Sequence, residues 1–570
     1  MFKNRQQTII FIVTALILLI ALVAGLLIDV TRDASKYAYI SKLIASNNQW
    51  INLQIDGEPY DQKPHLMFWL SALSFKIFGF TNFAFKLPIL LYSFLGLFFV
   101  YKLGNSCYNK NIALLATIMS AFSILFILYN QDLHTDTLLF TNTAFALWQL
   151  YEYIKTKRTI NIIGAGIALG LCLLTKGPYG VLLPFLCVVL FLVINKKWSM
   201  LINFRWLIIM AIAFFMALPV FYQLYLNWGI KGISFFFLGN TWGRFTGSYL
   251  GHTPDPTFYL HNLAYLFIPW SLIFFLGLYQ LGLQIIKKKA SLPDKFFFWG
   301  LLMFFLLLSI SISKLPNYMM AALPVMAIIT SKYWIENIQD HKTVVKIQHV
   351  IITILWILAL IILIYFVKTN LILAISILIT TYLAIIFITK RFSKPDQALY
   401  RSLATVAIIG LLLNLAVLPI LFGHQAQPKA AKYLNQYRQG DTPVFDYPKK
   451  ELKYIKHLAN DSTKVSEVEF KQTPAQKHFS LNYELKFYCH FQVQYIEKPE
   501  ELEAALMLPE KWFYTDEEGK NELLHYCPAP DTIINYQHFS LKRTAKYFIR
   551  NKQQSAFVNR YLLKISIPQN

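Results

Sequence analysis

Charged residues are scarce in this sequence. Asp, Glu, Lys and Arg make up 15% of its 570 residues, whereas soluble domains usually carry about 25%. Hydrophobic residues make up 56% and aromatic residues 16%. So little charge beside so much apolar surface excludes an intrinsically disordered chain. Cysteine is also rare, and five cysteines in a chain of this length exclude a small disulfide-rich scaffold.

Acids are the scarcer charge, with 30 Asp and Glu against 53 Lys and Arg, which gives a formal net charge of +23. A strongly basic balance often indicates a nucleic-acid partner. The high hydrophobicity favours a membrane instead, and we expect no nucleic-acid partner. The sequence also has no HExxH, CxxC or P-loop, and no GxGxxG in a suitable context, so we expect no nucleotide-dependent site on the cytoplasmic side.

Long hydrophobic runs recur along the chain. The first, 8–28, follows Lys3 and Arg5 and is too long for the apolar part of a signal peptide, which spans about 7–15 residues. We therefore expect an uncleaved first transmembrane helix that begins in the cytoplasm. About thirteen stretches are long enough to cross a bilayer: 8–28, 84–101, 111–129, 135–154, 160–175, 178–195, 204–226, 260–284, 296–313, 316–333, 347–367, 369–389 and 402–423.

The distribution of positive charge supports this alternation. The loops expected in the cytoplasm hold 21 of the 32 basic residues before position 424 and only five acids, whereas the opposite side holds 11 basic and 8 acidic residues. Cytoplasmic loops of membrane proteins carry an excess of Lys and Arg. The predicted fold is a polytopic α-helical membrane protein over 1–425, with the C-terminus outside the cytoplasm.

Two further regions lie outside the membrane in this topology. The outer loop 29–83 contains two apolar-periodic pieces, 33–46 and 65–78, which we expect as amphipathic helices on the membrane surface. Residues 426–570 have no spanning run and alternate short apolar strands with helix-like pieces, which predicts a small extracytoplasmic α/β domain. Cys489 and Cys527 in this domain fit either a disulfide or two free thiols.

Polar side chains gather at the outer boundary of the predicted bundle. A mixed group of carboxylates and cations at a membrane surface suits an anionic lipid phosphate, because Lys and Arg neutralise the phosphate and a carboxylate can act as a general base towards a hydroxyl. The candidates are Asp33, Lys63, Asp132, His134, Asp136, Lys176, Arg244, His252, Lys314 and Tyr318.

Several segments resemble one family of membrane enzymes. DASKYAYISKLIASNNQW and GEPYDQKPHLMFWLSALSFKIFG resemble the first outer loop of GT-C glycosyltransferases that use polyprenyl-phosphate sugars. LHTDTLLF, LLTKGPYGVLLP, NTWGRFTGSYLGHTPDPTFYLHNLAYLFIPWS and SKLPNYMMAALP resemble later family segments, in the family's order. More narrowly, the chain is similar to the 4-amino-4-deoxy-L-arabinose lipid A transferases, relatives of the protein O-mannosyltransferases. The resemblance covers nearly all of 1–425 and is weaker beyond it.

The chain departs from the family pattern at a few positions. Ala34 stands where the family has an acid after the first Asp, and residues 47–49 replace the usual Gly-Asp before Trp50. His65 stands where a second Pro is common, and Asn317 occupies a variable position. The change at Ala34 leaves open an inactive or receptor-like relative.

The resemblance implies roles for the candidates. Asp33 and Asp136 become the catalytic carboxylates, with Asp33 as the base and Asp136 at the acceptor or at a divalent ion. For lone residues, the competing interpretations are a helix N-cap for Asp33 and a snorkelling interface lysine for Lys63. The donor phosphate would be bound by Lys63, Arg244, Tyr318, Lys176 and Lys314, with Asp132, His134 and His252 in support. Asp33, Asp136 and His252 offer ligands for a hard, oxygen-rich metal site, but without a tight ligand spacing.

The resemblance implies an enzyme that moves a sugar from undecaprenyl phosphate or a similar lipid phosphate to lipid A or another envelope acceptor, by displacement with inversion at the anomeric carbon. A protein O-glycosyltransferase is the alternative within the family. A transporter or flippase for the same lipids is the alternative from another class, and it would place polar residues at the membrane midplane. We expect a monomer in the inner membrane, with a periplasmic C-terminal domain and no certain cofactor.

Overall fold

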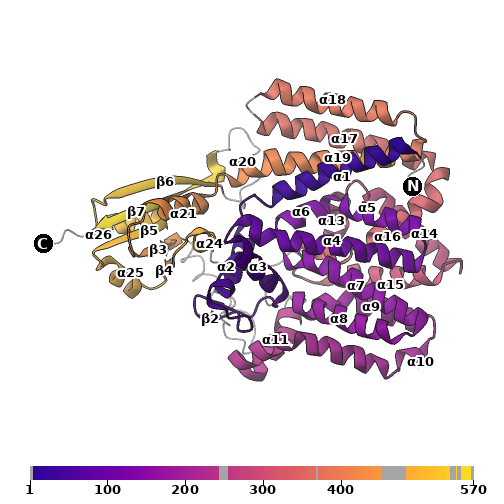
Figure 1. The fold of residues 1–570 in the computed structure, drawn as a ribbon, viewed down its shortest axis with the longest axis horizontal. Coiled ribbons are helices and arrows are strands. Elements are labelled where there is room, and N and C mark those ends of the chain that lie inside the picture. The colour runs from indigo at the N-terminus through magenta and orange to yellow at the C-terminus, as the bar shows by residue number, and fades with distance from the viewer. Residues whose placement is uncertain are drawn as a thin grey trace.

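The computed structural model describes residues 4–242, 255–367, 370–450, 483–539, 547 and 554–566. Helices of the N-terminal three quarters run roughly parallel as one bundle, and a mixed α/β domain lies at one end of it (Figure 1). The chain's N-terminus lies at the opposite end (Figure 1). This arrangement is the predicted one: a polytopic helical bundle followed by a small α/β domain.

Eight helical segments of the described residues are long and apolar enough to cross a membrane. They are α1 (Arg5–Gly25), α4 (Asn82–Cys107), α8 (Thr159–Lys176), α11 (Arg205–Ser234) with its flanking turns α10 (Trp198–Leu201) and η1 (Phe235–Trp242), α15 (Leu292–Ile310), α17 (Lys342–Phe366), α18 (Leu371–Thr389), and α19 (Lys394–Leu412) continued by η4 (Leu413–Val417) and α20 (Leu418–Phe422). The bent pair α5 (Lys110–Ala121) and α6 (Ile124–Gln131) makes a ninth if it counts as one span.

The remaining predicted stretches are also helical. They form α7 (Thr135–Thr156), α9 (Pro178–Ile194), α13 (Phe258–Leu266), α14 (Ser271–Ile286), and η2 (Pro316–Ala321) followed by α16 (Leu323–Asn337). The stretch expected as one helix over 260–284 is broken before Ser271, where the buried Trp270 donates its indole N–H to the Phe122 carbonyl at 2.6 Å. The number of thirteen crossings stays a prediction.

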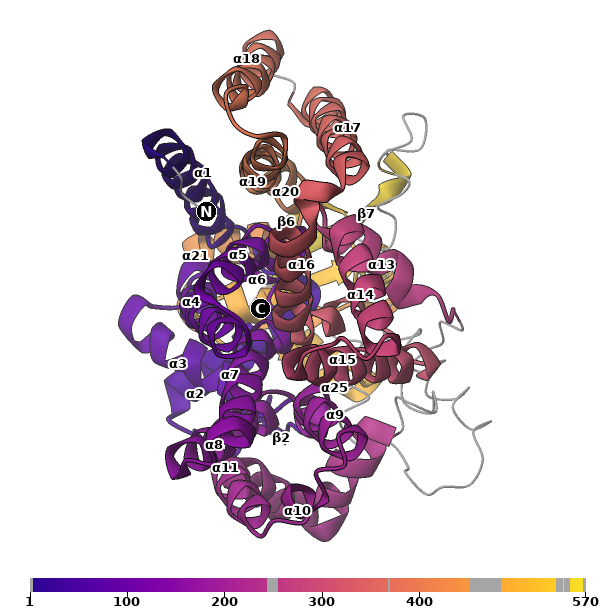
Figure 2. The same cartoon turned by 90° about the vertical axis from the view of Figure 1, so that its right-hand side faces the viewer.

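Burial explains why α7 is less apolar than a lipid-facing span. It is buried on nearly all sides, and its polar groups bond to neighbouring helices: Asn142 donates to Thr175 Oγ1 at 2.8 Å and accepts from the Tyr92 hydroxyl at 2.6 Å. Polar groups inside a bundle are tolerated when they are hydrogen-bonded. By contrast, α18 lies at the periphery, is almost entirely apolar and has only two buried residues, Leu378 and Thr389, as expected of a helix facing lipid (Figure 2).

The outer loop folds into two helices at the end of the bundle that faces the sheet domain. These are α2 (Arg32–Asn47) and α3 (Leu66–Phe78), joined through the short hairpin β1 (Gln54–Ile55) and β2 (Glu58–Pro59). Both match the predicted helical pieces. However, α2 is buried over most of its circumference, because the C-terminal domain covers the face that would otherwise meet water or lipid headgroups.

The C-terminal domain is built on a five-stranded sheet of order β4-β3-β5-β7-β6. Strand β3 is parallel to β4 and β5, whereas β7 is antiparallel to β5 and β6. The strands are β3 (Val444–Tyr447), β4 (Gln494–Tyr495), β5 (Glu510–Asp516), β6 (Thr532–Phe539) and β7 (Phe557–Ser566). The helices are α21 (Ala426–Tyr437), α24 (Glu484–Tyr488), α25 (Pro499–Leu506) and α26 (Glu517–Tyr526). Cys489 and Cys527 are free thiols in separate hydrophobic clusters.

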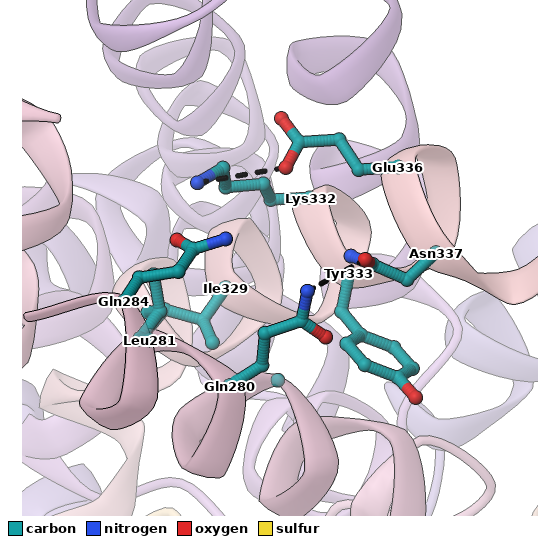
Figure 3. A pocket seen from close by; sticks show the side chains of 9 residues that line it. Gln280, Leu281, Gln284, Ile329, Lys332, Tyr333, Glu336 and Asn337 are labelled. Atoms are coloured by element: carbon teal, nitrogen blue, oxygen red, sulfur yellow. Dashed lines mark hydrogen bonds and ion pairs between the residues drawn. The ribbon is translucent and has the colours of Figure 1, made fainter. Parts of the chain in front are cut away.

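A second polar feature lies at the other end of the bundle, where α14 ends and α15 begins (Figure 1). Lys332 forms an ion pair with Asp294 at 2.8 Å and lies 3.6 Å from Glu336, and both members of the first pair are buried. Gln280 donates to Asn337 across a small polar pocket between α14 and α16 (Figure 3). These contacts join α14, α15 and α16 at the end expected in the cytoplasm.

Candidate functional site

The strongest polar cluster of the outer end is a buried ion pair between α7 and α8. Asp136 in the first turn of α7 accepts a hydrogen bond from the ammonium of Lys176, the last residue of α8. An acid near a helix N-terminus and a cation near a C-terminus are both favoured by the helix dipole. The Asp136 side chain is 1% exposed and that of Lys176 is 6% exposed, so the two charges compensate each other away from water.

Aromatic rings enclose the ammonium of this pair. Lys176 Nζ lies 3.9 Å from the ring centroid of Tyr318 and 4.6 Å from that of Tyr179, which are cation–π distances. Gly177, with a φ of +64°, turns the chain from α8 into α9, and Tyr179 follows it at the start of α9. The Tyr179 hydroxyl donates to the Tyr318 carbonyl at 3.2 Å, which holds η2 against the start of α9.

Asn317 completes the cluster. The sequence did not predict a role for this residue. Its side-chain amide donates to Asp136 Oδ2 at 2.7 Å. The structure therefore joins Asp136, Lys176 and Tyr318 from three separate segments, as expected, and adds Asn317 as a further ligand of the carboxylate. The family pattern marks position 317 as variable, so only its place beside Tyr318 in SKLPNY could have indicated this role.

A second group lies in the loop between α6 and α7. His134 Nε2 is 3.4 Å from Asp132 Oδ2, and the Thr31 hydroxyl donates to Asp132 Oδ1 at 2.6 Å. The carboxylates of Asp132, Asp136 and Asp33 all interact electrostatically with His134. The loop thus connects the buried pair to the start of α2.

Asp33 lies in the first turn of α2 and is exposed. The helix begins at Arg32 with Thr31 as its N-cap, so Asp33 is not the cap residue. Within the described residues its carboxylate accepts no hydrogen bond, which leaves it open to a ligand from outside the protein. A carboxylate that can reach a bound hydroxyl is able to accept its proton, which is the role of a general base.

Lys36, one turn after Asp33, was missed by sequence reasoning. It is buried, and its ammonium donates to Gln62 Oε1 at 3.1 Å. Gln62 precedes Lys63, which is half-buried in the loop between β2 and α3. This contact holds the Lys63 loop against α2 near Asp33. The sequence signal that could have indicated Lys36 is its position on the apolar side of the helical pattern over 33–46.

The Lys63 loop is anchored by buried polar groups on both sides. The His65 ring lies 2.7 Å from the Ile51 carbonyl through Nε2, and Gln223 of α11 donates to the Tyr60 carbonyl at 2.5 Å. Burial lowers the pKa of His65 to about 4, so the ring is neutral at physiological pH. Burial also raises the pKa of Asp61 to about 7, and its Oδ1 has no hydrogen-bond partner within the described residues.

Because the pKa of the buried Asp61 carboxyl is raised, we expect the stability of the protein to depend on pH. Its folded pKa exceeds the ordinary value of 3.8, so the folded protein holds a proton that the unfolded chain releases between about pH 4 and 7. This contribution to stability is present below pH 4 and is lost as the pH rises to about 7, by roughly 4 kcal/mol in total. We expect Asp61→Asn to remove that slope and to raise the melting temperature at pH 8. A melting temperature that changes with pH equally in both proteins would contradict this.

The other candidates are placed less centrally. Lys314 is buried in the segment between α15 and η2, where the Tyr259 hydroxyl donates to the neighbouring Leu315 carbonyl at 3.3 Å. Arg244 and His252 lie outside the described residues. Lys86, inside a predicted span, is a second buried cation that the sequence did not single out. It donates to the carbonyls of Ile28 at 2.8 Å and Gly25 at 3.2 Å, at the end of α1.

The part of the chain that the structure describes offers few grouped ligands for a metal ion. No group of three or more His, Cys, Asp and Glu side chains there could hold a metal ion. Asp136, one of the three ligands considered, is already occupied by Lys176 and Asn317. Asp33 is exposed, and His252 lies outside the described residues.

Comparison with known proteins is consistent with this geometry. Residues 62–222 match the family described as dolichyl-phosphate-mannose-protein mannosyltransferase. A protein of Proteus mirabilis named undecaprenyl phosphate-alpha-4-amino-4-deoxy-L-arabinose arabinosyl transferase 2 is 24% identical over 54% of this chain and 56% of its own length. A Photorhabdus laumondii protein named as an arabinosyl transferase of the same kind is 27% identical over 58% of this chain and 60% of its own length. The chain thus spans less than two thirds of these relatives.

The structural likeness extends further than the sequence likeness. The crystal structure of ArnT from Cupriavidus metallidurans bound to undecaprenyl phosphate superposes with a TM-score of 0.70, covering 99% of both chains at 14% identity. That likeness includes the C-terminal sheet domain, where the motifs were weakest. The resemblance read from the motifs is therefore confirmed: this chain is an integral membrane protein with the fold of ArnT, and in sequence it resembles the aminoarabinose transferases among the GT-C glycosyltransferases.

Proposed function

We propose that this protein is a glycosyltransferase that takes a sugar from a polyprenyl-phosphate donor and passes it to a hydroxyl group at the outer face of the membrane. The observation that carries the proposal is the outer-end cluster. Asp33 is exposed in the first turn of α2, and one turn later the buried Lys36 bonds to Gln62, which precedes Lys63, in a fold shared with a protein crystallised with undecaprenyl phosphate.

The chemistry is a displacement at the anomeric carbon of the sugar. The acceptor oxygen forms a bond to this carbon as the bond to the phosphate oxygen breaks, which inverts the configuration. Asp33 takes the proton of the acceptor hydroxyl, and the polyprenyl phosphate leaves with the electron pair of the broken bond. Lys63 neutralises the leaving phosphate, together with Arg244 and Tyr318, while the Asp136–Lys176 pair fixes η2 and the start of α7 around it.

The acceptor in this proposal is lipid A or another envelope glycan. The names of the relatives support a transferred pentose of the 4-amino-4-deoxy-L-arabinose type. A protein hydroxyl is the second candidate, because the matching family is described as a protein mannosyltransferase. The protein would act as a monomer in the inner membrane, with its N-terminus in the cytoplasm and the sheet domain in the periplasm.

A lipid transporter is the rival function. Transporters bind their substrates near the membrane midplane through broken helices. Here the buried pairs of the described bundle lie at helix ends: Asp136 at the start of α7 pairs with Lys176 at the end of α8, and Asp294 at the start of α15 pairs with Lys332 of α16. The exposed carboxylate of Asp33 also belongs to the outer end. This distribution favours chemistry at one membrane surface.

The decisive experiment uses purified full-length protein in liposomes with an undecaprenyl-phosphate sugar labelled in the sugar. We expect the label to appear on added lipid A while undecaprenyl phosphate accumulates, both followed by mass spectrometry. Labelling of a protein hydroxyl instead would select the second acceptor. Movement of the intact labelled lipid across the bilayer, with no release of undecaprenyl phosphate, would reject the transferase and establish the transporter.

A further inference from the structure

Among the described elements of the C-terminal domain, the short helix α24 packs on α2 of the outer loop and lies between the sheet and α2 (Figure 1). Tyr483 and Phe487, beside and within α24, are fully buried in the hydrophobic cluster formed by α2, α3 and α4. Phe487 packs on Phe75 at 5.9 Å between ring centroids, and Tyr483 stacks on Tyr39 at 5.8 Å. The sheet domain is therefore part of the outer-loop core.

Polar contacts fix the orientation of α24 on this core. Lys486, whose side chain is 3% exposed, forms an ion pair with Asp56 at 2.5 Å. Lys42 of α2 donates to the carbonyls of Lys486 at 3.0 Å and Phe487 at 3.1 Å, so it caps the end of α24. Buried, hydrogen-bonded charges tolerate few alternative arrangements, because moving either partner would leave a charge unpaired.

The last residue of α24 reaches the connection between α1 and α2, residues 26–31, which we call the α1–α2 corner. The Tyr488 hydroxyl accepts a hydrogen bond from the Val30 N–H at 3.0 Å and donates to Asn82 Oδ1 at 2.7 Å. It also lies 3.3 Å from Asp29 Oδ1, and Asn82 donates to that same oxygen at 3.0 Å. One hydroxyl of the sheet domain thus joins the corner to the start of α4.

The corner is held from its other side by the α6–α7 loop, through the bond from Thr31 to Asp132. Asp33 follows two residues later, in the first turn of α2. The corner is therefore held by the bundle at Thr31 and at Ile28, whose carbonyl accepts a hydrogen bond from Lys86, and by the C-terminal domain through Tyr488. A displacement of about 1 Å at a reacting group can cost about a hundredfold in rate.

We propose that α24 is the element through which the sheet domain sets the position of Asp33, with the Tyr488 hydroxyl as the positioning group at the α1–α2 corner. This inference rests on the proposed transferase function and assigns the C-terminal domain a part in it. Tyr488 does not contact the substrate. It acts through the corner, so its loss should slow the chemical step and leave the donor site formed around Lys63 intact.

The test compares Tyr488→Phe with the wild type in the liposome assay. We expect kcat to fall about tenfold to a hundredfold while KM for the donor keeps its wild-type value. Tyr536→Phe is the matched control, because it removes the same atom from β6, away from the corner, and it should transfer sugar at the wild-type rate. Asn82→Ala should slow transfer to a similar extent, and combining it with Tyr488→Phe should add little, since the two groups form one contact.

Amide hydrogen exchange of residues 30–36 provides a readout that does not depend on activity. Faster exchange in Tyr488→Phe than in Tyr536→Phe would show that the hydroxyl holds the corner, even if the wild type transfers no sugar and the proposed function fails. Wild-type transfer by Tyr488→Phe would overturn the inference and leave the function standing. Equal losses of activity in Tyr488→Phe and Tyr536→Phe would also overturn it, because they would indicate general destabilisation of the domain.

Discussion

Replacing Asp33 by Asn should nearly abolish sugar transfer, with kcat falling about a hundredfold to ten-thousandfold, because a positioned general base contributes that much to such a step. The change is isosteric and removes only the charge and basicity of the carboxylate. Asp33 is exposed, and no described residue hydrogen-bonds its carboxylate, so the folded protein should tolerate the amide. The measurement is the rate of undecaprenyl phosphate release by purified protein in liposomes.

Two comparisons separate catalysis from folding in this experiment. Asp441→Asn changes an exposed carboxylate of the sheet domain, which pairs only weakly with Arg438 at 4.0 Å, and it should leave the rate unchanged. Asp33→Glu keeps the carboxylate but moves it by one methylene, so part of the activity should remain. If Asp33→Asn turns over at the wild-type rate, Asp33 is not the base, and the transferase mechanism proposed for this site is wrong.

The architecture of the bundle was largely accessible from the sequence, because long apolar runs and the asymmetry of Lys and Arg report directly on membrane crossings. What hydropathy could not show is that α7 lies inside the bundle. Its Asn142 is satisfied by Tyr92 and Thr175 from two other helices, contacts that exist only after the helices pack. Hydropathy measures the free energy of transferring side chains into lipid, and α7 does not face lipid.

The C-terminal domain was only partly predictable. The expected pieces TPVFDY, FQVQYIE, KWFYTDE and TIINYQHF correspond to four of its five strands, whereas β7, α21 and α26 were not predicted. Strand β7 lies between β5 and β6, and four consecutive residues of it, Arg560–Leu563, are buried. A strand buried on both faces lacks the alternation of apolar and polar residues by which a half-exposed strand is identified.

The sequence placed several candidate residues at one end of the bundle but could not show how they pair. The topology placed Asp136, Lys176 and Tyr318 at the same boundary, and the family resemblance assigned Lys176 to the donor phosphate. In the structure Lys176 is paired with Asp136, so it is not a free cation. That pairing depends on how α7 and α8 pack. The sequence does not reveal a contact between two residues that lie 40 positions apart. Lys36 and Asn317 escaped notice for the same reason, since their partners lie on other elements.

The buried pair predicts an effect on both stability and activity. Asp136→Asn or Lys176→Met alone leaves one charge buried without its partner, which typically costs about 3–5 kcal/mol, so each should lower the melting temperature in detergent sharply and reduce transfer as well. The double change Asp136→Asn with Lys176→Met removes both charges, and stability should return towards the wild-type value. Transfer should not return, because the charges that shape the phosphate end of the site are then missing.

The pair at the opposite end of the bundle is the matched control. Asp294 and Lys332 are likewise buried and 2.8 Å apart, but they lie between α15 and α16, away from the outer cluster. Asp294→Asn and Lys332→Met should each destabilise the protein, and their combination should restore both the melting temperature and the transfer rate. If the Asp136–Lys176 double variant also recovers its activity, that pair serves the fold alone. If it recovers stability but not transfer, the pair belongs to the site, because the same substitutions at the other buried pair then leave transfer intact.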